Sequence, residues 1–243
     1  MSTVIIIPAR LNSSRLARKI LLDLNGQTVI EHVFKRCSQV SSIDGVHIAV
    51  DSEETMEICK KFTSNVHMTS TKHESGTDRI AEVAKNIQCD NVLNVQGDEP
   101  FINVDLLNRI VETLESSSNS SIDIVTACCP IESSESFLNP NNVKVVLDNF
   151  NNALYFSRAA IPFSRDNTIN LELSAKHIGV YGYRKQSLLK FVSAPQNVLE
   201  RVEKLEQLRA LSMGLKIQVL RELESVIGID TLEDYEQAKL FSL

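Results

Sequence analysis

In the first half of the chain, short apolar runs alternate with segments in which apolar residues recur at helical spacing. The apolar runs, each short enough for a buried strand, are Thr3–Ile7, Val46–Val50, Val66–Met68 and Val92–Val95. The helical segments carry their apolar residues at Ile30, Val33, Phe34 and Cys37, and again at Ile80, Val83, Ala84 and Ile87. Strands and helices that alternate in this way predict an α/β fold with a mostly parallel, doubly wound sheet.

The second half follows a different pattern, in which strand-like runs are separated by loops. The polar tract Ser116–Ser121 reads as a surface turn, because an apolar run, Ile122–Ala127, follows it at once. Further strands are predicted at Val143–Leu147, Ala153–Phe156, His177–Tyr183 and Lys216–Leu220. We therefore predict a single domain over residues 1–243 with a β-rich insertion in its second half, where apolar residues between 150 and 185 fit an interface.

Four cations, Arg10, Arg15, Arg18 and Lys19, lie close together after the first predicted strand. The chain as a whole has a net charge of −6, of which residues 1–36 carry +4 and the remainder −10. Nucleic acids and anionic membranes need a broad basic face rather than one basic loop, so we expect a small anion as the partner.

The cysteines and the apolar runs indicate where the protein works. Five cysteines form an odd set without C-x-x-C spacing, and the first residues do not resemble a signal peptide. No apolar run approaches the roughly 20 residues that span a bilayer. The expected location is the reducing cytoplasm.

The loop after the first strand combines guanidinium forks, hydroxyl donors and an ammonium, a mixture that suits phosphate oxygens. Ligands of doubly wound sheets bind at the carboxyl ends of the strands, where this loop lies. The candidate phosphate-binding residues are Arg10, Ser13, Ser14, Arg15 and Lys19. A solvated basic loop is the alternative, since the sequence matches neither the P-loop nor the G-x-G-x-x-G motif.

Two aspartates follow apolar runs elsewhere in the chain. In VLNVQGDEP, Asp98 comes at the end of a strand and either helps to hold a hard cation or caps the helix predicted at Asp105–Leu114. In VIGIDTLEDY, Thr231 starts a capping box, which leaves Asp230 available for a metal ion. Two such aspartates and a phosphate loop predict Mg²⁺-assisted phosphoryl or nucleotidyl transfer.

The stretch HESGTDR precedes the helix that runs through Ile87. Thr77 is the expected N-cap of that helix, and Ser75 and Gly76 either contact ligand at its positive end or serve the turn alone. His73 by itself fits a surface histidine.

Two stretches of the second half carry polar groups in a regular arrangement. In HIGVYGY, alternation places His177, Gly179, Tyr181 and Tyr183 on one face, which suits either a polyhydroxylated ligand or interface packing. The stretch ERVEKLEQLRALSMG reads as one helix that ends at Gly214. Within it, Glu206 lies near the buried stripe, either as a rim charge or as a hydroxyl-binding group.

Several motifs in order give the chain a resemblance to a known family. They are IIIPARLNSSRL with a following lysine, SGTDRIAEV, NVLNVQGDEP, FLNPNNVKVVLD, ALYFSRAAIPF, HIGVYGYR, VEKLEQLRAL and GIDTLEDYEQA. Together they resemble the 3-deoxy-manno-octulosonate (Kdo) cytidylyltransferases over nearly the whole length. The resemblance implies a Rossmann-like nucleotidyltransferase fold, a homodimer, and the joining of CTP to Kdo for lipopolysaccharide with release of pyrophosphate.

The resemblance also implies roles for individual residues. Arg10, Ser13, Ser14, Arg15 and Lys19 would hold the CTP phosphates, and Ser75 and Gly76 would help to enclose the nucleotide. Asp98 and Asp230 would hold Mg²⁺ and, with Lys19, form the catalytic set. The sugar acid would contact Gln96, Arg158, His177, Tyr181, Glu206 and Gln207. Residues 1–130 would thus form a CTP-binding half and residues 131–243 a sugar-binding and dimerisation half.

The chain departs from the family where SSRLARKIL replaces the usual SSRLPGKPL. Arg18 stands in the place of a glycine and is strained if that position requires a positive φ. The departures leave open a related acidic sugar, such as 8-amino-Kdo or a sialic-type acid, and a non-catalytic nucleotide-binding relative.

Overall fold

The computed structural model describes residues 1–12, 16–116, 121–166, 169, 171–223 and 228–241. Ser13, Ser14 and Arg15 of the predicted phosphate loop lie outside these residues. The chain forms two compact units, which we call unit 1, residues 1–112 with 226–243, and unit 2, residues 113–225.

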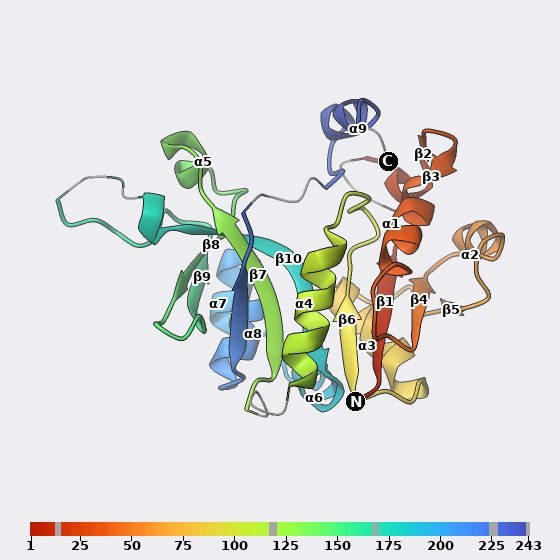
Figure 1. The fold of residues 1–243 in the computed structure, drawn as a ribbon, viewed down its shortest axis with the longest axis horizontal. Coiled ribbons are helices and arrows are strands. Elements are labelled where there is room, and N and C mark those ends of the chain that lie inside the picture. Colours follow the sequence, from red (N-terminus) through yellow and green to blue (C-terminus); the bar gives the residue numbers. More distant parts are fainter. Residues whose placement is uncertain (13–15, 117–120, 167–168, 170, 224–227, 242–243) are drawn as a thin grey trace. The chain divides into compact units, whose positions relative to one another are not determined.

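Unit 1 is built on a parallel sheet with the strand order β6-β1-β4-β5 (Figure 1). Its strands are β1 (Thr3–Ala9), β4 (Gly45–Val50), β5 (Val66–Met68) and β6 (Asn91–Asn94). Every residue of β1 is buried, and Ile5 lies opposite both Val46 and Leu93. Strands covered on both faces have continuous apolar sequences, so the parallel sheet predicted from these runs is confirmed.

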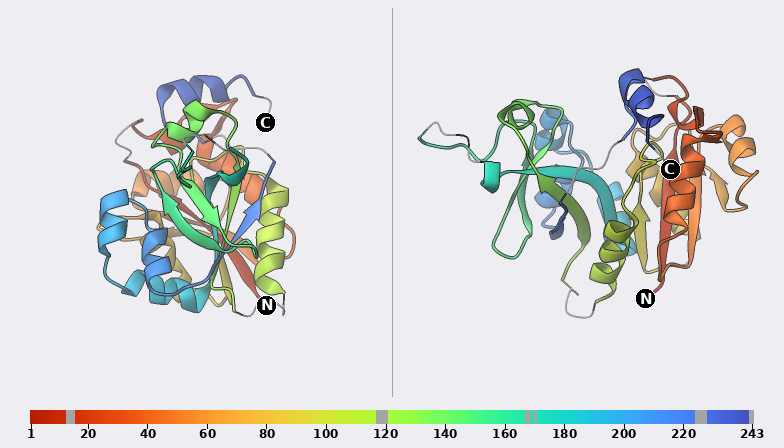
Figure 2. Two further views of the ribbon diagram at one scale, coloured as in Figure 1. Left: turned by 90° about the vertical axis from the view of Figure 1, so that its left-hand side faces the viewer. Right: turned by 45° about the horizontal axis from the view of Figure 1, so that its top comes forward.

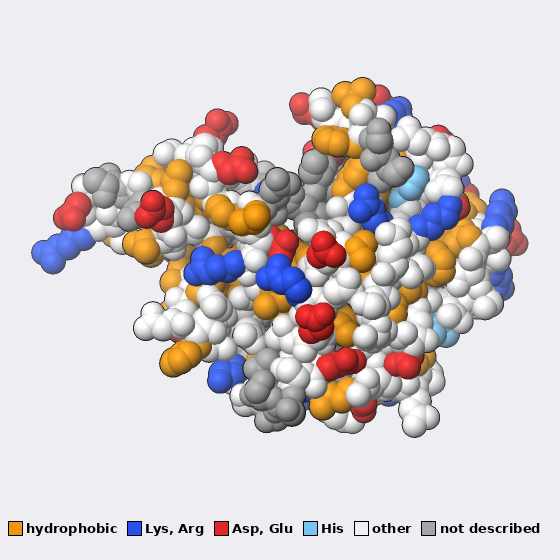
Figure 3. Space-filling model, viewed as in Figure 1, with side chains coloured by type: hydrophobic (Ala, Val, Ile, Leu, Met, Phe, Trp, Pro, Cys, Tyr) orange, Lys and Arg blue, Asp and Glu red, His pale blue; other side chains and the backbone are white. Residues whose placement is uncertain are grey.

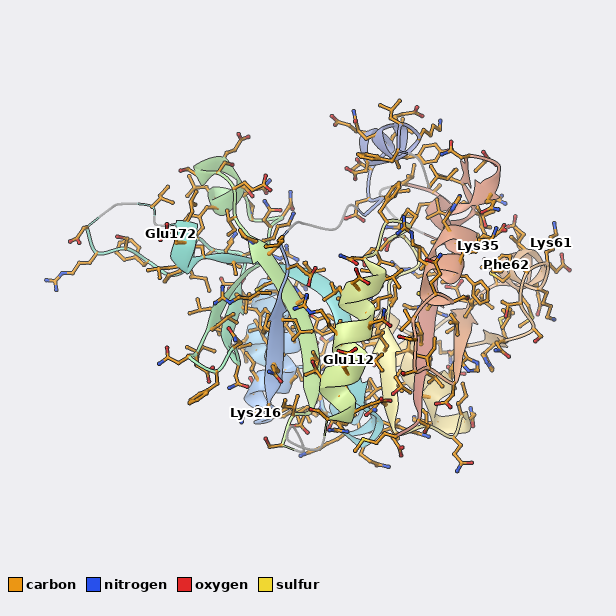
Figure 4. All side chains as sticks on the ribbon, in the orientation of Figure 1. Lys35, Lys61, Phe62, Glu112, Glu172 and Lys216 are labelled. Carbon is orange, nitrogen blue, oxygen red and sulfur yellow. The ribbon has the colours of Figure 1, made fainter. Side chains whose placement is uncertain are left out.

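Helices and one small hairpin cover this sheet. The helix α3 packs on β1, β4 and β6, and α1 packs on β1. The bounds are η1 (Lys19–Leu21), α1 (Val29–Cys37), α2 (Glu53–Cys59), α3 (Gly76–Asn86), α4 (Val104–Glu115) and α9 (Leu232–Ala238), with the hairpin β2 (Asp23–Leu24) and β3 (Gln27–Thr28). Phe62, labelled in Figure 4, follows α2 and packs on Phe34 of α1 with ring centroids 5.3 Å apart.

The last helix, α9, packs beside the N-terminal hairpin, and both views of Figure 2 show it there. Ile229 and Ala238 form a buried apolar cluster with Leu24 and Val29. The hydroxyl of Tyr235 also donates to the carbonyl of Asp23. The C-terminal residues are therefore an integral part of unit 1.

Unit 2 is rich in β-structure, as predicted. Its strands are β7 (Ile124–Pro130), β8 (Lys144–Leu147), β9 (Ala153–Ser157), β10 (Ala175–Arg184) and β11 (Ile217–Arg221). β7 pairs antiparallel with β10 and parallel with β11, while β8 pairs antiparallel with β10 and β9. The helices are α5 (Ser134–Leu138), η3 (Leu171–Leu173), α6 (Lys185–Ser193), α7 (Val198–Glu203) and α8 (Gln207–Ser212).

The prediction of a single helix over ERVEKLEQLRALSMG is wrong, because the helix breaks at Lys204, between α7 and α8. Lys204 adopts a left-handed conformation with φ 55°, and its N–H bonds back to the carbonyl of Glu200. The break lets α8 fold against α7, where Arg209 lies 3.1 Å from the carboxylate of Glu200 and both side chains are buried. Glu206 therefore begins the second helix instead of lying one turn beyond Val202.

In its described residues, the structure agrees with the expectations of no broad basic face and no membrane-spanning segment. On the face shown in Figure 3, Lys and Arg side chains lie among Asp and Glu side chains, without a continuous basic surface. All five cysteines are free and buried. Within the ranges given above, no helix is long and apolar enough to cross a membrane.

Candidate active site

A cavity of about 190 Å³ opens in unit 1 at the carboxyl ends of β1 and β6. This is the edge at which parallel sheets bind ligands. Predicted site residues line it, namely Arg10, Lys19, Ser75, Gly76, Gln96 and Asp98. The structure thus brings together residues from three separate sequence motifs.

The turn after β6 places Asp98 at this cavity. Gly97 allows the turn to approach β1, because a Cβ on it would lie 2.9 Å from the carbonyl oxygen of Pro8. The carbonyl of Asp98 accepts the N–H of Ile229 at 2.9 Å, which joins this turn to the segment before α9. Asp98 does not cap α4, where Asn103 accepts the N–H of Asp105 at 2.9 Å.

Asp230 reaches the same place because of the cap of α9. The predicted capping box is confirmed: Thr231 accepts the N–H of Asp234, and the Asp234 carboxylate accepts the N–H of Thr231 at 2.8 Å. Asp230, directly before the cap, accepts a 3.0 Å hydrogen bond from Lys19, and Lys19 also contacts the carboxylate of Asp98. The predicted catalytic residues therefore meet around one ammonium.

Electrostatics at this cluster favour a further cation. Burial lowers the pKa of Lys19, but the carboxylates of Asp98 and Asp230 outweigh burial and the pKa is raised. Glu99 has one buried carboxylate oxygen, Oε2, without a hydrogen-bond partner. Burial, together with the charges of Asp98 and Asp230, raises the pKa of Glu99 to about 8. Glu99 is therefore largely neutral at pH 7, and the two aspartates around one ammonium leave a negative charge that a hard divalent cation would neutralise.

The N-terminus of α3 forms another wall of the cavity. Ser75 is the N-cap, since its hydroxyl accepts the N–H of Asp78 at 3.1 Å, so the prediction of Thr77 as the cap is wrong. The helix starts two residues earlier than predicted, at Gly76. Gly76 fits closely against Pro8 and Gln96, whose side-chain atoms would lie 3.2 and 3.5 Å from a Cβ at this position. His73 also lines the cavity and pairs with Glu82.

Arg18 has the positive φ that its place in the motif suggested. Its φ is 56° and its ψ is 25°, a left-handed conformation that favours glycine. Its guanidinium pairs with Glu54 of α2, and 57% of the side chain is exposed. Arg18 is thus a strained residue that ties the loop to a neighbouring helix.

Sequence reasoning missed Arg79, whose side chain is only 2% exposed and lines the cavity. It pairs with Asp51, which follows β4, at 3.2 Å. The available signal was its spacing: Arg79 lies one helical turn before Val83, on the buried stripe of α3.

In unit 2, three of the predicted sugar-binding residues lie close together. The rings of His177 and Tyr181 are 5.3 Å apart, and the charge of Glu206 is among the causes that raise the pKa of Tyr181, after burial and Tyr183. A bulge in β10 between Ile178 and Tyr181 accommodates Thr126, whose hydroxyl lies 3.0 Å from His177 Nε2. Burial lowers the pKa of His177 to about 3, so the imidazole is neutral.

Arg158 lies at the end of β9 and is held by main-chain carbonyls. Its Nε donates to the carbonyl of Glu203 at 2.8 Å, and its Nη1 donates to that of Pro140 at 3.0 Å. The carboxylate of Glu203 also accepts the N–H of Arg158 at 2.9 Å. Gln207, the first residue of α8, is buried, whereas Gln96 belongs to unit 1.

Comparison with known proteins identifies the family of this chain. Residues 4–217 match the model of a family described as cytidylyltransferase. The protein is therefore a cytidylyltransferase by family. At the level of fold alone, it also resembles 4-diphosphocytidyl-2C-methyl-D-erythritol synthase from Anaerococcus prevotii, with 17% identity, a TM-score of 0.67, and coverage of 98% of this chain and 94% of that one.

More similar proteins define the family further. The 3-deoxy-manno-octulosonate cytidylyltransferase of Elusimicrobium minutum is 42% identical, covering 98% of this chain and 97% of that protein. The protein of the same name from Nitratiruptor sp. is 44% identical over 96% and 97%. A solved structure of CMP:2-keto-3-deoxy-manno-octonic acid synthetase complexed with CTP is 34% identical, with a TM-score of 0.92 over 98% and 97%. The chain belongs to the 3-deoxy-manno-octulosonate cytidylyltransferase family.

Proposed function

We propose that this protein transfers CMP from CTP to the anomeric hydroxyl of Kdo, for lipopolysaccharide biosynthesis. The anomeric oxygen forms a bond to the α-phosphorus, the bond from that phosphorus to the β-phosphate oxygen breaks, and pyrophosphate leaves as the hydroxyl loses its proton. The observation that carries the proposal is the position of Lys19 between Asp98 and Asp230 beside a cavity lined by Arg10 and Ser75. Such an arrangement suits positioning and charge neutralisation.

We assign the nucleotide to this cavity. Arg10 and Lys19 bind its phosphates, and Ser75 and Gly76 enclose it; by resemblance, Ser13, Ser14 and Arg15 complete the phosphate loop. Arg10 supplies a fork for paired phosphate oxygens, and Lys19 supplies a point charge.

We further propose that Asp98 and Asp230 hold Mg²⁺. The donor set fits, since both side chains are carboxylates and their oxygens share the one ammonium of Lys19. In the described part of the chain no group of three His, Cys, Asp or Glu is arranged to hold a metal ion. Phosphate and water oxygens would therefore complete the coordination, as Mg²⁺ commonly requires. When bound, the ion neutralises phosphate charge and favours departure of pyrophosphate.

In unit 2 we assign the sugar acid to Arg158, His177, Tyr181, Glu206 and Gln207. The same role for Gln96 of unit 1 stays a prediction from the resemblance. We propose that the guanidinium of Arg158 donates to the sugar carboxylate from Nη2, while main-chain carbonyls hold its Nε and Nη1 in place. The neutral imidazole of His177 and the hydroxyl of Tyr181 suit sugar hydroxyls.

A homodimer in the cytoplasm completes the proposal. Large apolar side chains are exposed in unit 2, including Phe150 (80%), Phe163 (82%) and Leu173 (66%). We propose that the dimer covers side chains of this kind, since large exposed apolar surfaces commonly mark protein interfaces. Sedimentation analysis tests the dimer, and a Phe163→Glu variant that sediments as a monomer would support this surface as the interface.

The decisive experiment measures pyrophosphate release with CTP, Mg²⁺ and a panel of 2-keto-3-deoxy sugar acids. Turnover with Kdo is the expected result. Turnover only with 8-amino-Kdo or a sialic-type acid would move the assignment to that sugar. Binding of CTP without turnover of any sugar would contradict the enzymatic function and indicate a nucleotide-binding relative.

A further inference from the structure

A largely buried ion pair between Asp51 and Arg79 lies at the cavity of unit 1, and Arg79 belongs to the cavity lining. Asp51 uses both of its carboxylate oxygens: Oδ1 accepts the N–H of Leu11 at 2.9 Å, and Oδ2 accepts a hydrogen bond from Arg79 Nη2 at 3.2 Å. Leu11 is the residue after Arg10, just beyond the end of β1. The pair thus acts on the main chain that carries Arg10.

Arg79 is in turn held by the ends of two other strands. Its Nη1 donates to Thr69 Oγ1 at 2.6 Å, and that hydroxyl donates to the carbonyl of Val50 at 2.7 Å. Thr69 follows β5, and Val50 ends β4. The guanidinium therefore joins α3 to the same sheet edge at which the cavity opens.

A contribution to protein stability is a weak explanation for the buried ion pair of Asp51 and Arg79. Taking two charges out of water is costly, and a buried ion pair often stabilises a protein no better than apolar residues of the same volume. Burial lowers the pKa of Arg79 and the charge of Arg10 lowers it further, whereas Asp51 raises it. Asp51 thus lets two guanidiniums lie near each other at the cavity.

We propose that Asp51 and Arg79 are positioning residues: they fix the main chain at residues 10 and 11, so that Arg10 is aimed at the triphosphate before CTP binds. The inference rests on the proposed CTP site. A side chain positioned in advance contributes more to affinity, because less freedom is lost on binding. Neither residue needs to touch the nucleotide for this role.

The test measures the affinities of CTP and CMP calorimetrically for the full chain and for Arg79→Gln and Asp51→Asn. Both variants are expected to weaken CTP binding about tenfold or more, equivalent to about 1.4 kcal/mol, and CMP binding by less than about threefold. The CTP-to-CMP ratio is informative because general damage to the fold weakens both ligands alike. Arg79→Lys keeps the buried charge but loses the fork, and it replaces Arg79→Gln if that variant does not fold.

Two controls separate positioning from a structural role. Arg209→Gln removes a buried ion pair of unit 2, so it should lower the melting temperature without changing the CTP-to-CMP ratio. In an Arg10→Ala background, Arg79→Gln should weaken CTP binding by less than about threefold, because its effect acts through Arg10.

Each other outcome overturns the inference. A ratio unchanged in both variants, or an undiminished effect of Arg79→Gln in the Arg10→Ala background, overturns it while the proposed function stands. Failure of the unaltered chain to bind CTP overturns the proposed nucleotide site, and this inference with it.

Discussion

The ammonium of Lys19 donates a hydrogen bond to Asp230 Oδ1 at 3.0 Å, although the two residues are 211 positions apart in the sequence. The same ammonium contacts Asp98 after β6. One side chain therefore links the three segments that carry the proposed catalytic residues, and changes to these side chains should affect catalysis more than folding.

Asp98→Asn should reduce Mg²⁺-dependent turnover by about 100-fold or more, a loss typical of removing one preorganised charged group. The fold should persist, because the carbonyl of Asp98, and not its carboxylate, joins the turn to Ile229. Pyrophosphate release and circular dichroism measure the two effects. The matched control is Asp105→Asn, at an exposed position of α4. Near-normal activity of Asp98→Asn would refute the metal assignment.

Arg18→Gly should be more stable than Arg18→Ala by about 1 kcal/mol, because glycine adopts the left-handed conformation without strain. Both variants lose the exposed pair with Glu54, which contributes less than about 1 kcal/mol. Urea denaturation gives the difference. An alanine variant as stable as the glycine variant would show that the strain at this position is negligible.

Arg158→Met should raise the KM for the sugar acid about tenfold or more and leave the dissociation constant of CTP unchanged. The reason is that the guanidinium is the proposed partner of the sugar carboxylate. Steady-state kinetics at saturating CTP measure the change, with Arg201→Met on the exposed face of α7 as the control. A CTP affinity that falls together with the sugar affinity would contradict the separate assignment.

Stability should decrease as the pH falls below about 6.5, because buried histidines must gain charge on protonation. Burial, and then the nearby His67, lower the pKa of His47 to about 4, and burial lowers that of His177 to about 3. Between these values and the ordinary pKa of 6.5, the unfolded chain binds more protons, so the contribution is complete above pH 6.5 and is lost towards pH 4.

Urea midpoints measured from pH 7.5 to 5 test this dependence. His47→Gln should have a shallower dependence than the unaltered chain, because it removes one of the groups responsible. Identical slopes for the two proteins would contradict a role for His47.

Much of the sheet could be predicted from the sequence because its strands are buried on both faces, which leaves unbroken apolar runs such as that of β1. The break between α7 and α8 could not be predicted in this way. Lys204 ends α7 in a left-handed conformation, and in a sequence such a helix end is usually recognised by a glycine. The cap of α3 was predicted at Thr77 instead of Ser75, because both serine and threonine favour this position and the sequence does not show which of them starts the helix.

In the candidate site, too, some residues leave a recognisable sequence pattern and others do not. Asp98 and Asp230 each follow an apolar run and so could be recognised, whereas the Asp51–Arg79 pair joins residues 28 positions apart and leaves no periodic signal. The sugar-binding roles came from resemblance and stay predictions.

Unit 1 combines residues 1–112 with residues 226–243, so the ribosome synthesises its two parts at different times. A ribosome completes Lys19 and Asp98 before any residue of unit 2, and Asp230 after all of them. At about 5–20 residues per second, the roughly 130 intervening residues take on the order of ten seconds. Until then the nascent chain lacks Asp230, so the proposed catalytic cluster can form only after the whole of unit 2 has been synthesised.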